Sequence, residues 1–134
     1  MKKNNSIIIG SGVIGSYLAK FLLSKKQRII VTSRKRKKSY TNYNKLNIEN
    51  KIIFEKLNFL KKDEILKLLK KYTPKNIFYF SGQSSLTKSI KLKKVTNDSN
   101  YIGAKKILEI LHKYELKTNF YKANSGYIFE PNKG

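Results

Sequence analysis

Apolar and polar positions alternate along the chain with two different periods. Short apolar runs typical of buried strands cover residues 6–9, 28–32, 52–55, 76–80 and 119–122. Between these runs, apolar residues recur at the spacing of a helical face, which predicts helices over residues 13–24, 61–72 and 95–114. The polar segment 33–50 is expected to be a loop with one short helical turn. In the first helix, the stripe expected to lie on the sheet consists of Val13, Ile14, Tyr17, Leu18, Phe21 and Leu22.

The alternation of strands and helices predicts the fold class. Parallel strands joined by right-handed helical crossovers form a doubly wound α/β sheet. The expected strand order is 3-2-1-4-5, which reverses between the first and the fourth strand, and ligands of such sheets bind at the carboxyl ends of the strands near the reversal. Residues 1–134 are therefore expected to form one Rossmann domain, truncated after its fifth strand.

A glycine-rich loop connects the first strand to the first helix. It consists of Gly10, Ser11, Gly12, Val13, Ile14 and Gly15. In this context the first glycine permits a tight turn, the second lets the backbone approach a pyrophosphate, and the third lets helix and strand pack closely. The amino end of the helix adds free N–H groups and a positive partial charge. The segment therefore predicts a dinucleotide-binding loop.

The composition limits the classes of protein that fit. A chain of 134 residues with 40% hydrophobic and 12% aromatic content suits one folded domain. No apolar run approaches the length of a membrane span or a signal-peptide core, so a cytoplasmic protein without membrane partners is expected. The absence of cysteine excludes disulfides and thiolate metal sites, and no metal is expected.

The formal net charge of +22 raises the possibility of nucleic-acid binding. Nearly all the cations are lysines, however, and they are spread along the chain together with many isoleucines and asparagines, as AT-rich coding sequences produce. Only residues 34–38 form a basic cluster. Nucleic acid is therefore not the expected partner, whereas the positive field attracts anionic ligands such as nucleotide sugars.

The basic cluster begins at the end of the second strand, where the chain reads Ser33, Arg34, Lys35, Arg36. An acidic residue at this position would hold the ribose hydroxyls of NAD, whereas an arginine accommodates the additional phosphate of NADP. No acidic residue is present, and an arginine binds phosphate through paired hydrogen bonds. NADP is therefore favoured over NAD, and a solvated basic loop is the alternative.

Segments farther along the chain carry a family resemblance. Phe80-Ser-Gly-Gln-Ser84 resembles Leu-Ala/Gly-Ala-Gln-Ser, and Asn119-Phe-Tyr-Lys-Ala-Asn-Ser125 resembles Arg-Phe-Tyr-Gln-Ala-Ser-Thr. Residues 15–23 and 100–109 resemble the first and fourth helices of the same proteins. These proteins are the extended short-chain dehydrogenase/reductase superfamily, and the greatest similarity is to GDP-mannose 4,6-dehydratases, the NADP-dependent enzymes that remove water from a nucleotide sugar.

The resemblance implies a role for each matching position. It places the glycine loop on the pyrophosphate, Arg34 to Arg36 on the adenosine 2′-phosphate, and Asn58 and Phe59 on either side of adenine. It also implies that Ser125 is the catalytic Ser/Thr, which hydrogen-bonds O4 of the sugar, and that Tyr127 is a second catalytic position. The segment along the nicotinamide ribose consists of Phe80, Ser81, Gly82, Gln83 and Ser84.

Several positions depart from the family pattern. Ile9 stands where the extended branch usually has its first glycine, Asn58 replaces an aspartate, and Tyr127 replaces the glutamate that removes the C5 proton in the dehydratases. Tyrosine is a poor base at neutral pH because its ordinary pKa is about 10. An epimerase or ketoreductase acting on a nucleotide sugar is therefore the alternative activity, and a non-catalytic dinucleotide- or nucleic-acid-binding module is the alternative from another class.

The superfamily's Tyr-x-x-x-Lys pair does not occur after Ser125. The expectation is that the chain is the cofactor half of a homo-oligomeric enzyme, that its substrate domain is absent, and that this half alone is inactive.

Overall fold

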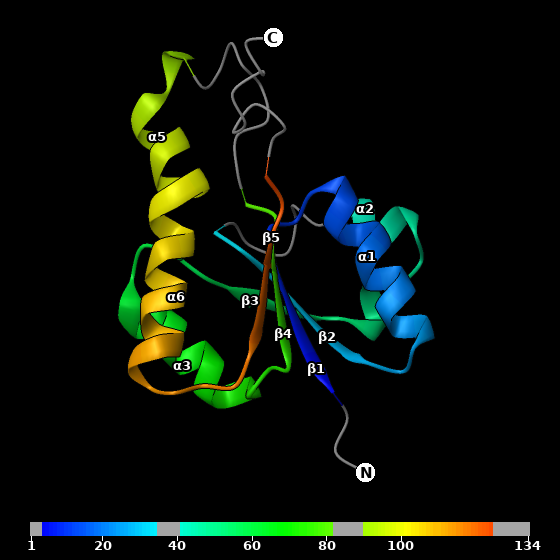
Figure 1. Cartoon of the computed structure of the whole chain (residues 1–134). Coiled ribbons are helices and arrows are strands. Elements are labelled where there is room, and N and C mark those ends of the chain that lie inside the picture. The colour runs from blue at the N-terminus through cyan, green and yellow to red at the C-terminus, as the bar shows by residue number, and fades with distance from the viewer. Residues whose placement is uncertain (1–3, 35–40, 82–89, 125–134) are drawn as a thin grey trace, which may run out of the picture.

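The sheet is parallel and has five strands. The structure, a computed structural model, describes residues 4–34, 41–81 and 90–124. The strand order is β3-β2-β1-β4-β5, which confirms the predicted order and fold class (Figure 1). The strands are β1 (Asn5–Ile9), β2 (Arg28–Ser33), β3 (Ile53–Lys56), β4 (Asn76–Tyr79) and β5 (Asn119–Lys122).

Helices lie on both sides of the sheet (Figure 1). One side carries α1 (Val13–Ser24), α2 (Thr41–Lys45) and the short 3-10 helix η2 (Glu49–Lys51). The other side carries α3 (Lys62–Tyr72), α5 (Lys93–Asn97), the π-helical turn η3 (Asp98–Ile102) and α6 (Gly103–Lys113). The last three run on without a break, so the helix expected over residues 95–114 is present with a π turn inside it.

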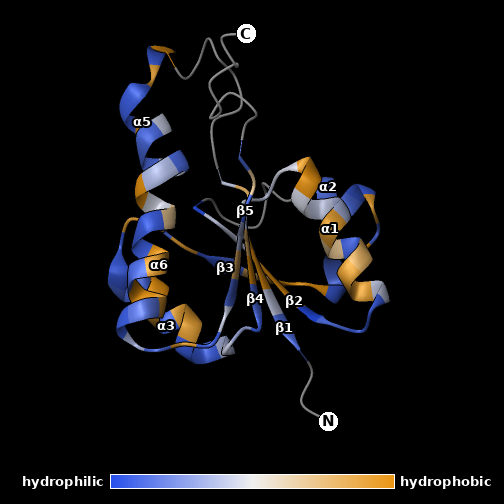
Figure 2. Cartoon of the chain, viewed as in Figure 1, coloured by the Kyte–Doolittle hydropathy of each residue, from blue (hydrophilic) through white to orange (hydrophobic). Residues whose placement is uncertain are grey.

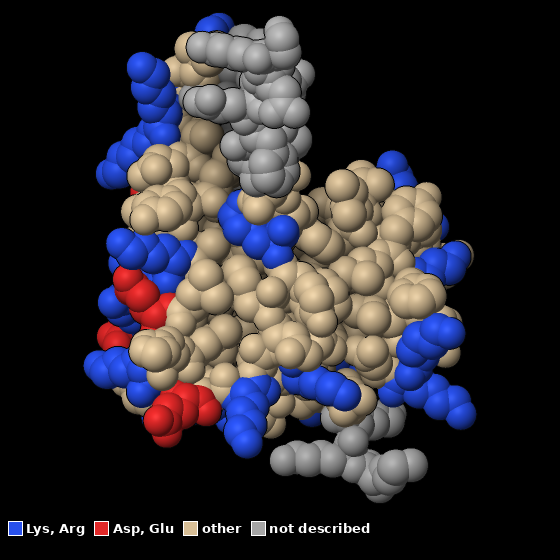
Figure 3. Space-filling view, in the orientation of Figure 1, with Lys and Arg blue, Asp and Glu red and all other residues tan. Residues whose placement is uncertain are grey.

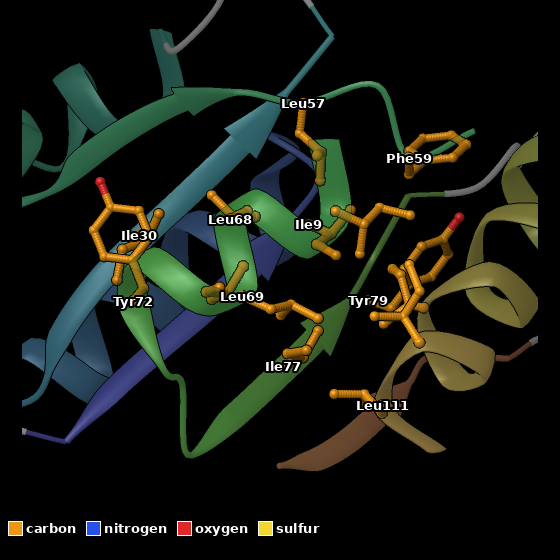
Figure 4. Close-up of a cluster of buried hydrophobic side chains, with 14 of the residues drawn as sticks. Ile9, Ile30, Leu57, Phe59, Leu68, Leu69, Tyr72, Ile77, Tyr79 and Leu111 are labelled. Carbon is orange, nitrogen blue, oxygen red and sulfur yellow. The ribbon is translucent and has the colours of Figure 1, made fainter. Parts of the chain in front are cut away.

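Each side of the sheet buries its own apolar cluster. Ile7 and Ile9 of β1 point toward α3 and α6, whereas Ile8, between them, points toward α1. Figure 4 shows the larger cluster, in which Leu68, Leu69 and other residues of α3 pack on Ile30 of β2 and Ile77 of β4. Burial of both faces explains why β1 reads as a continuous apolar run without polar alternation.

The prediction for the buried face of α1 is wrong for four of its six residues, whereas Leu22 is buried and Leu18 is partly buried against the same cluster, as predicted. Val13, Ile14, Tyr17 and Phe21 are 57–72% exposed, whereas the residues that face the sheet are mainly small. The buried residues of α1 are Gly15, Ser16, Ala19 and Leu22. The small side chains let the helix axis approach the bulky isoleucines of β1 and β2, and the larger apolar stripe then faces away from the sheet. In Figure 2, hydrophobic positions (orange) occur along α1 and along the neighbouring strands of the sheet.

The surface charge is distributed, as the sequence indicated. In Figure 3, Lys and Arg side chains lie around the edge of the visible face, and the area between β5 and α1 is largely uncharged. Within the described residues, no helix is both long enough and apolar enough to cross a membrane.

Candidate dinucleotide-binding site

Gly10 makes the turn that leads from β1 to α1. Its φ is +112°, which side-chain-bearing residues rarely adopt. A Cβ atom on Gly10 would also lie 3.1 Å from the carbonyl carbon of Phe80 and 3.1 Å from the backbone nitrogen of Ser81. Glycine is therefore required here by the fold, because the loop passes directly over the end of β4.

Gly12 is in a different environment. Its backbone is extended (φ −75°, ψ 178°), a conformation open to any residue, and a Cβ on it would meet no atom of the described residues within 4 Å. Gly12 is also the N-cap of α1, so its missing side chain leaves the first-turn N–H groups of the helix uncapped. The glycine pattern predicts a diphosphate in the open space beside these N–H groups, and this assignment stays a prediction.

Contacts from α2 hold the loop in place. The Asn42 side chain donates a hydrogen bond to the Ser11 carbonyl over 3.5 Å. A Cβ on Gly15 would lie 3.1 Å from Cγ2 of Ile8 and 3.3 Å from the Tyr43 hydroxyl, so Gly15 allows α1 to pack closely against both β1 and α2. Sequence reasoning missed Asn42 and Tyr43, because one polar residue and one aromatic in a lysine-rich segment carry no recognisable pattern.

Arg34 follows β2 at the carboxyl end of the sheet. Its guanidinium lies over the ring of Phe59, 5.1 Å from the ring centre, and this contact keeps an exposed cation beside the strand ends. Ser33 is half-buried, and its carbonyl accepts a hydrogen bond from the backbone N–H of Leu57. Lys35 and Arg36 lie outside the described residues. The assignment of Arg34 to an adenosine phosphate stays a prediction.

The loop after β3 contains the pair predicted to lie beside adenine. The backbone N–H of Asn58 donates to the Glu64 carboxylate over 2.8 Å, and its side-chain oxygen accepts from the N–H of Leu60 over 3.0 Å. Phe59 is 3% exposed and packs edge-on against Tyr79, with 6.0 Å between ring centres. Asn58 thus shapes the loop and Phe59 belongs to the apolar core, with the Arg34 guanidinium above its ring.

Tyr79 ends β4, and Phe80 follows it beside the glycine loop. Burial raises the pKa of the Tyr79 phenol far above its usual range, and the nearby Arg34 only partly offsets this rise. The hydroxyl stays protonated and donates a hydrogen bond to the Ser99 carbonyl in the π turn. Tyr79 thus connects β4 to the helix that contains η3. Phe80 is half-buried and its N–H donates to the Ile9 carbonyl over 2.8 Å, which places Phe80 and Ser81 under Gly10.

The remaining predicted positions lie outside the described residues. They are Gly82, Gln83 and Ser84 of the nicotinamide-side segment and the candidate catalytic residues Ser125 and Tyr127. The structure therefore brings together the pyrophosphate loop, Arg34, Phe59 and the start of the segment after β4, all at the carboxyl edge of the sheet.

This combination of a doubly wound sheet and a glycine loop at the reversal of strand order defines a Rossmann domain. Residues 7–129 match the family described as GDP-mannose 4,6 dehydratase, and the chain belongs to that family. A search of curated protein sequences gave no match.

Solved structures share the fold over a part of their length. UDP-glucose 4-epimerase from Thermotoga maritima, with UDP-glucose, superposes with a TM-score of 0.77 at 21% identity over 91% of this chain and 38% of that one. The epimerase from Stenotrophomonas maltophila, with NAD and formylated UDP-arabinopyranose, gives 0.83 at 15% identity over 98% and 40%. L-threonine dehydrogenase from Clostridium difficile gives 0.73 at 26% identity over 93% and 37%. The chain spans about two fifths of the length of these proteins.

Proposed function

We propose that the chain is the NADP-binding part of a nucleotide-sugar 4,6-dehydratase that acts on GDP-mannose. The observation that carries the proposal is the pair of glycines in the loop. Gly10 is fixed by the fold, whereas Gly12 is free of contacts and leaves the amino end of α1 open to a diphosphate. The family match over residues 7–129 supports the sugar chemistry.

Residues that follow three different strands would each bind a different part of the cofactor. The N–H groups of the α1 first turn would hold the pyrophosphate, and the Arg34 guanidinium would hold the 2′-phosphate. Phe80 and Ser81 would lie along the nicotinamide ribose. When bound, the nicotinamide supplies a hydride acceptor for oxidation of the sugar. Ser125, as the family's Ser/Thr, would orient the sugar by a hydrogen bond to O4.

The second candidate is an epimerase or ketoreductase on the same nucleotide-sugar scaffold. Tyr127 in place of a glutamate favours it, since a phenol is a poor base for the elimination of water. The solved relatives with UDP-glucose and with NAD plus a UDP-sugar are consistent with this alternative. Both candidates use the same cofactor site. A dehydratase and an epimerase would differ in the step after oxidation of the sugar, whereas a ketoreductase would transfer hydride from the reduced cofactor to a keto sugar.

The substrate domain and the Tyr-x-x-x-Lys pair would come from polypeptide beyond residue 134. Two exposed apolar surfaces, which a further domain could cover, support this. The exposed stripe of α1 is one, and the other is the α1 side of the sheet edge, where Tyr121 is 48% exposed and stacks on Phe78 with 4.9 Å between ring centres. Parallel sheets are normally covered on both faces.

Homo-oligomerisation is proposed through the α5 to α6 side, where Val95, Tyr101 and Leu108 are 42–55% exposed.

Cofactor choice is tested by calorimetry with NADP and NAD. We expect tighter binding of NADP and loss of the preference in Arg34→Asp, because an acidic side chain repels the 2′-phosphate. Lys20→Asp on the exposed side of α1 changes the net charge equally and should keep the preference. Equal affinities of the unaltered chain for the two cofactors would reject the NADP assignment.

The reaction is tested by mass spectrometry of products from GDP-mannose, using a polypeptide extended through the family's C-terminal part. A product lighter by one water supports the dehydratase, and an isomer of unchanged mass supports the epimerase. In the extended protein, Ser125→Ala should lower kcat far more than cofactor affinity, since the hydroxyl acts on the sugar. Turnover by residues 1–134 alone would contradict this placement of the catalytic groups.

A further inference from the structure

A basic pocket lies at the amino end of the sheet, opposite to the glycine loop. We call it the amino-end pocket, and it has a volume of about 800 Å³. Its lining residues are Asn5, Leu23, Lys26, Gln27, Arg28, Lys51, Lys71, Tyr72 and Thr73. The five residues of β1 separate it from Gly10 by roughly 16 Å at the usual rise per strand residue. In Figure 1 this is the end of the sheet at which the N-terminus lies.

The charge of the pocket is positive and largely unbalanced. Four lining residues are cations and none is acidic. Lys71 binds Glu55 over 2.7 Å, and hydrogen bonds from Lys71 and Tyr72 hold the pKa of that carboxyl below its usual range. Across the described residues, Lys26, Arg28 and Lys51 form no ion pair. Three of the four cationic residues that line the pocket therefore have no ion-pair partner among the described residues.

Hydrogen bonds fix the frame of the pocket. The Asn5 side chain donates to the Tyr72 carbonyl, which ties β1 to the end of α3. The Ser6 hydroxyl donates to the side-chain oxygen of Gln27 over 2.6 Å, so the amide N–H groups of Gln27 are left as donors. Arg28 lies over the Tyr72 ring at 5.6 Å, which orients its guanidinium. The Gln27 and Arg28 side chains are thus held in place before any ligand arrives.

The carbonyl ends of α1 and α3 also point toward this end of the sheet, and they attract cations. Backbone N–H groups already bond to carbonyl groups at both helix ends. The N–H of Thr73 caps the Leu69 carbonyl over 2.8 Å, and the N–H of Gln27 caps the Leu22 carbonyl over 3.2 Å. Each helix end carries only about half an elementary charge. Two such ends leave a surplus of positive charge in the pocket.

The lining selects among anions. The volume is in the range of small-molecule sites. The one aromatic ring of the lining, Tyr72, is 4% exposed and lies under Arg28 and Lys71, so it offers no platform on which a nucleic-acid base could stack. The available groups are cations and amide donors, which suit phosphate oxygens. We infer that the amino-end pocket binds a small polyphosphate anion, separately from the dinucleotide.

The test is calorimetric titration of the chain with sodium tripolyphosphate at about 0.15 M salt, where long-range attraction is screened. The pocket variant is Lys26→Gly with Lys51→Gln. Glycine suits position 26 because Lys26 has φ +60°, and Lys51 is exposed, so both changes should leave the fold intact. The control is Lys20→Gln with Lys105→Gln, which removes the same charge from exposed sites on α1 and α6.

We expect the pocket variant to raise the Kd for tripolyphosphate at least 10-fold and the control variant to change it by less than about 2-fold, because only the pocket variant removes charges that line the hollow. Backbone NMR signals of Asn5 and Thr73 should shift on titration, and those of Gly10 and Gly12 should not. Equal weakening in both variants, no binding at millimolar tripolyphosphate, or shifts confined to the glycine loop would each overturn the inference. So would binding of single-stranded DNA alone that depends on Lys26 and Lys51.

Discussion

The two loop glycines give a prediction that separates folding from ligand binding. In Gly10→Ala, the alanine would have to adopt a φ of +112°. Its methyl group would lie 3.1 Å from the carbonyl carbon of Phe80 and 3.1 Å from the backbone nitrogen of Ser81. A side chain in such a conformation costs about 1–3 kcal/mol, and an overpacked contact adds about 1–3 kcal/mol. We expect Gly10→Ala to lower the free energy of unfolding by about 2–5 kcal/mol. This is a large part of the stability of a small domain.

Gly12→Ala is the matched variant. Alanine is a poorer N-cap than glycine by roughly 0.5–1 kcal/mol, and it lowers the entropy of the unfolded chain by about the same amount, so the two effects nearly cancel. The free energy of unfolding should change by less than about 1 kcal/mol. The affinity for dinucleotide should nevertheless fall at least 10-fold, since the methyl group enters the space open to the pyrophosphate, an expected loss of about 1.4 kcal/mol.

Urea denaturation followed by circular dichroism measures the stability of both variants, and calorimetry with NADP measures the affinity. With a slope of about 2 kcal/mol per molar urea, Gly10→Ala should move the midpoint by roughly 1–2.5 M. A neutral Gly10→Ala, or a Gly12→Ala that destabilises as strongly, would refute the structural argument. Unchanged binding in a folded Gly12→Ala protein would refute the ligand assignment alone.

The packing and charge of the domain give three further predictions. Tyr17→Ser and Phe21→Ser should each cost less than about 0.5 kcal/mol in urea denaturation, whereas Leu22→Ala should cost about 2–4 kcal/mol, and equal costs would contradict the observed face of α1. Glu55 has a lowered pKa, so its stabilising contribution is present above about pH 5 and is lost as the pH falls through that lowered pKa. Glu55→Gln should therefore make the free energy of unfolding depend less on pH in the acid range. An unchanged pH dependence would count against the hydrogen bonds from Lys71 and Tyr72. Filter binding should show only weak DNA or RNA binding that is lost between about 50 and 200 mM salt; sequence-selective binding that survives would favour a nucleic-acid function.

The strands and their order could be predicted because each depends on local signals. Isoleucine-rich runs such as residues 7–9 are buried on both faces, and the glycine turn marks where the first strand ends and the first helix begins. Right-handed crossovers then leave few possible topologies. The observed strand bounds differ from the predicted ones by one residue at several ends, where pairing and not hydrophobicity decides.

The packing face of α1 could not be predicted from periodicity. The pattern locates an apolar stripe, but it cannot show whether that stripe meets this sheet or another polypeptide. Here Gly15 and Ala19 allow a closer approach to the isoleucines than Tyr17 or Phe21 would, so the small side of the helix is buried. The Tyr17 and Phe21 side is available to a covering segment.

In the candidate site too, some features depend on the local sequence and others on contacts between distant segments. The residues after β1 and β2 were placed correctly at the carboxyl edge because strand ends determine their location. The burial of Phe59 and the support of the loop by Asn42 depend on segments that are distant in sequence, and no local pattern encodes them. The contrast between Gly10 and Gly12 likewise appears only once β4 lies beneath the loop.

The two ends of the sheet present different groups to an anion. This difference explains why the sequence predicted an anion site at the carboxyl end and none at the amino end. At the carboxyl end, α1 presents N–H groups, so a phosphate needs backbone access and the necessary residue is a glycine with a recognisable spacing. At the amino end, α1 and α3 present carbonyl groups, so a phosphate can be held only by full side-chain charges that exceed the partial charges of the helices. Such a site is built from lysines and an arginine, and with 30 Lys and Arg in the chain, Lys26, Arg28 and Lys51 stand out only after the fold brings them together.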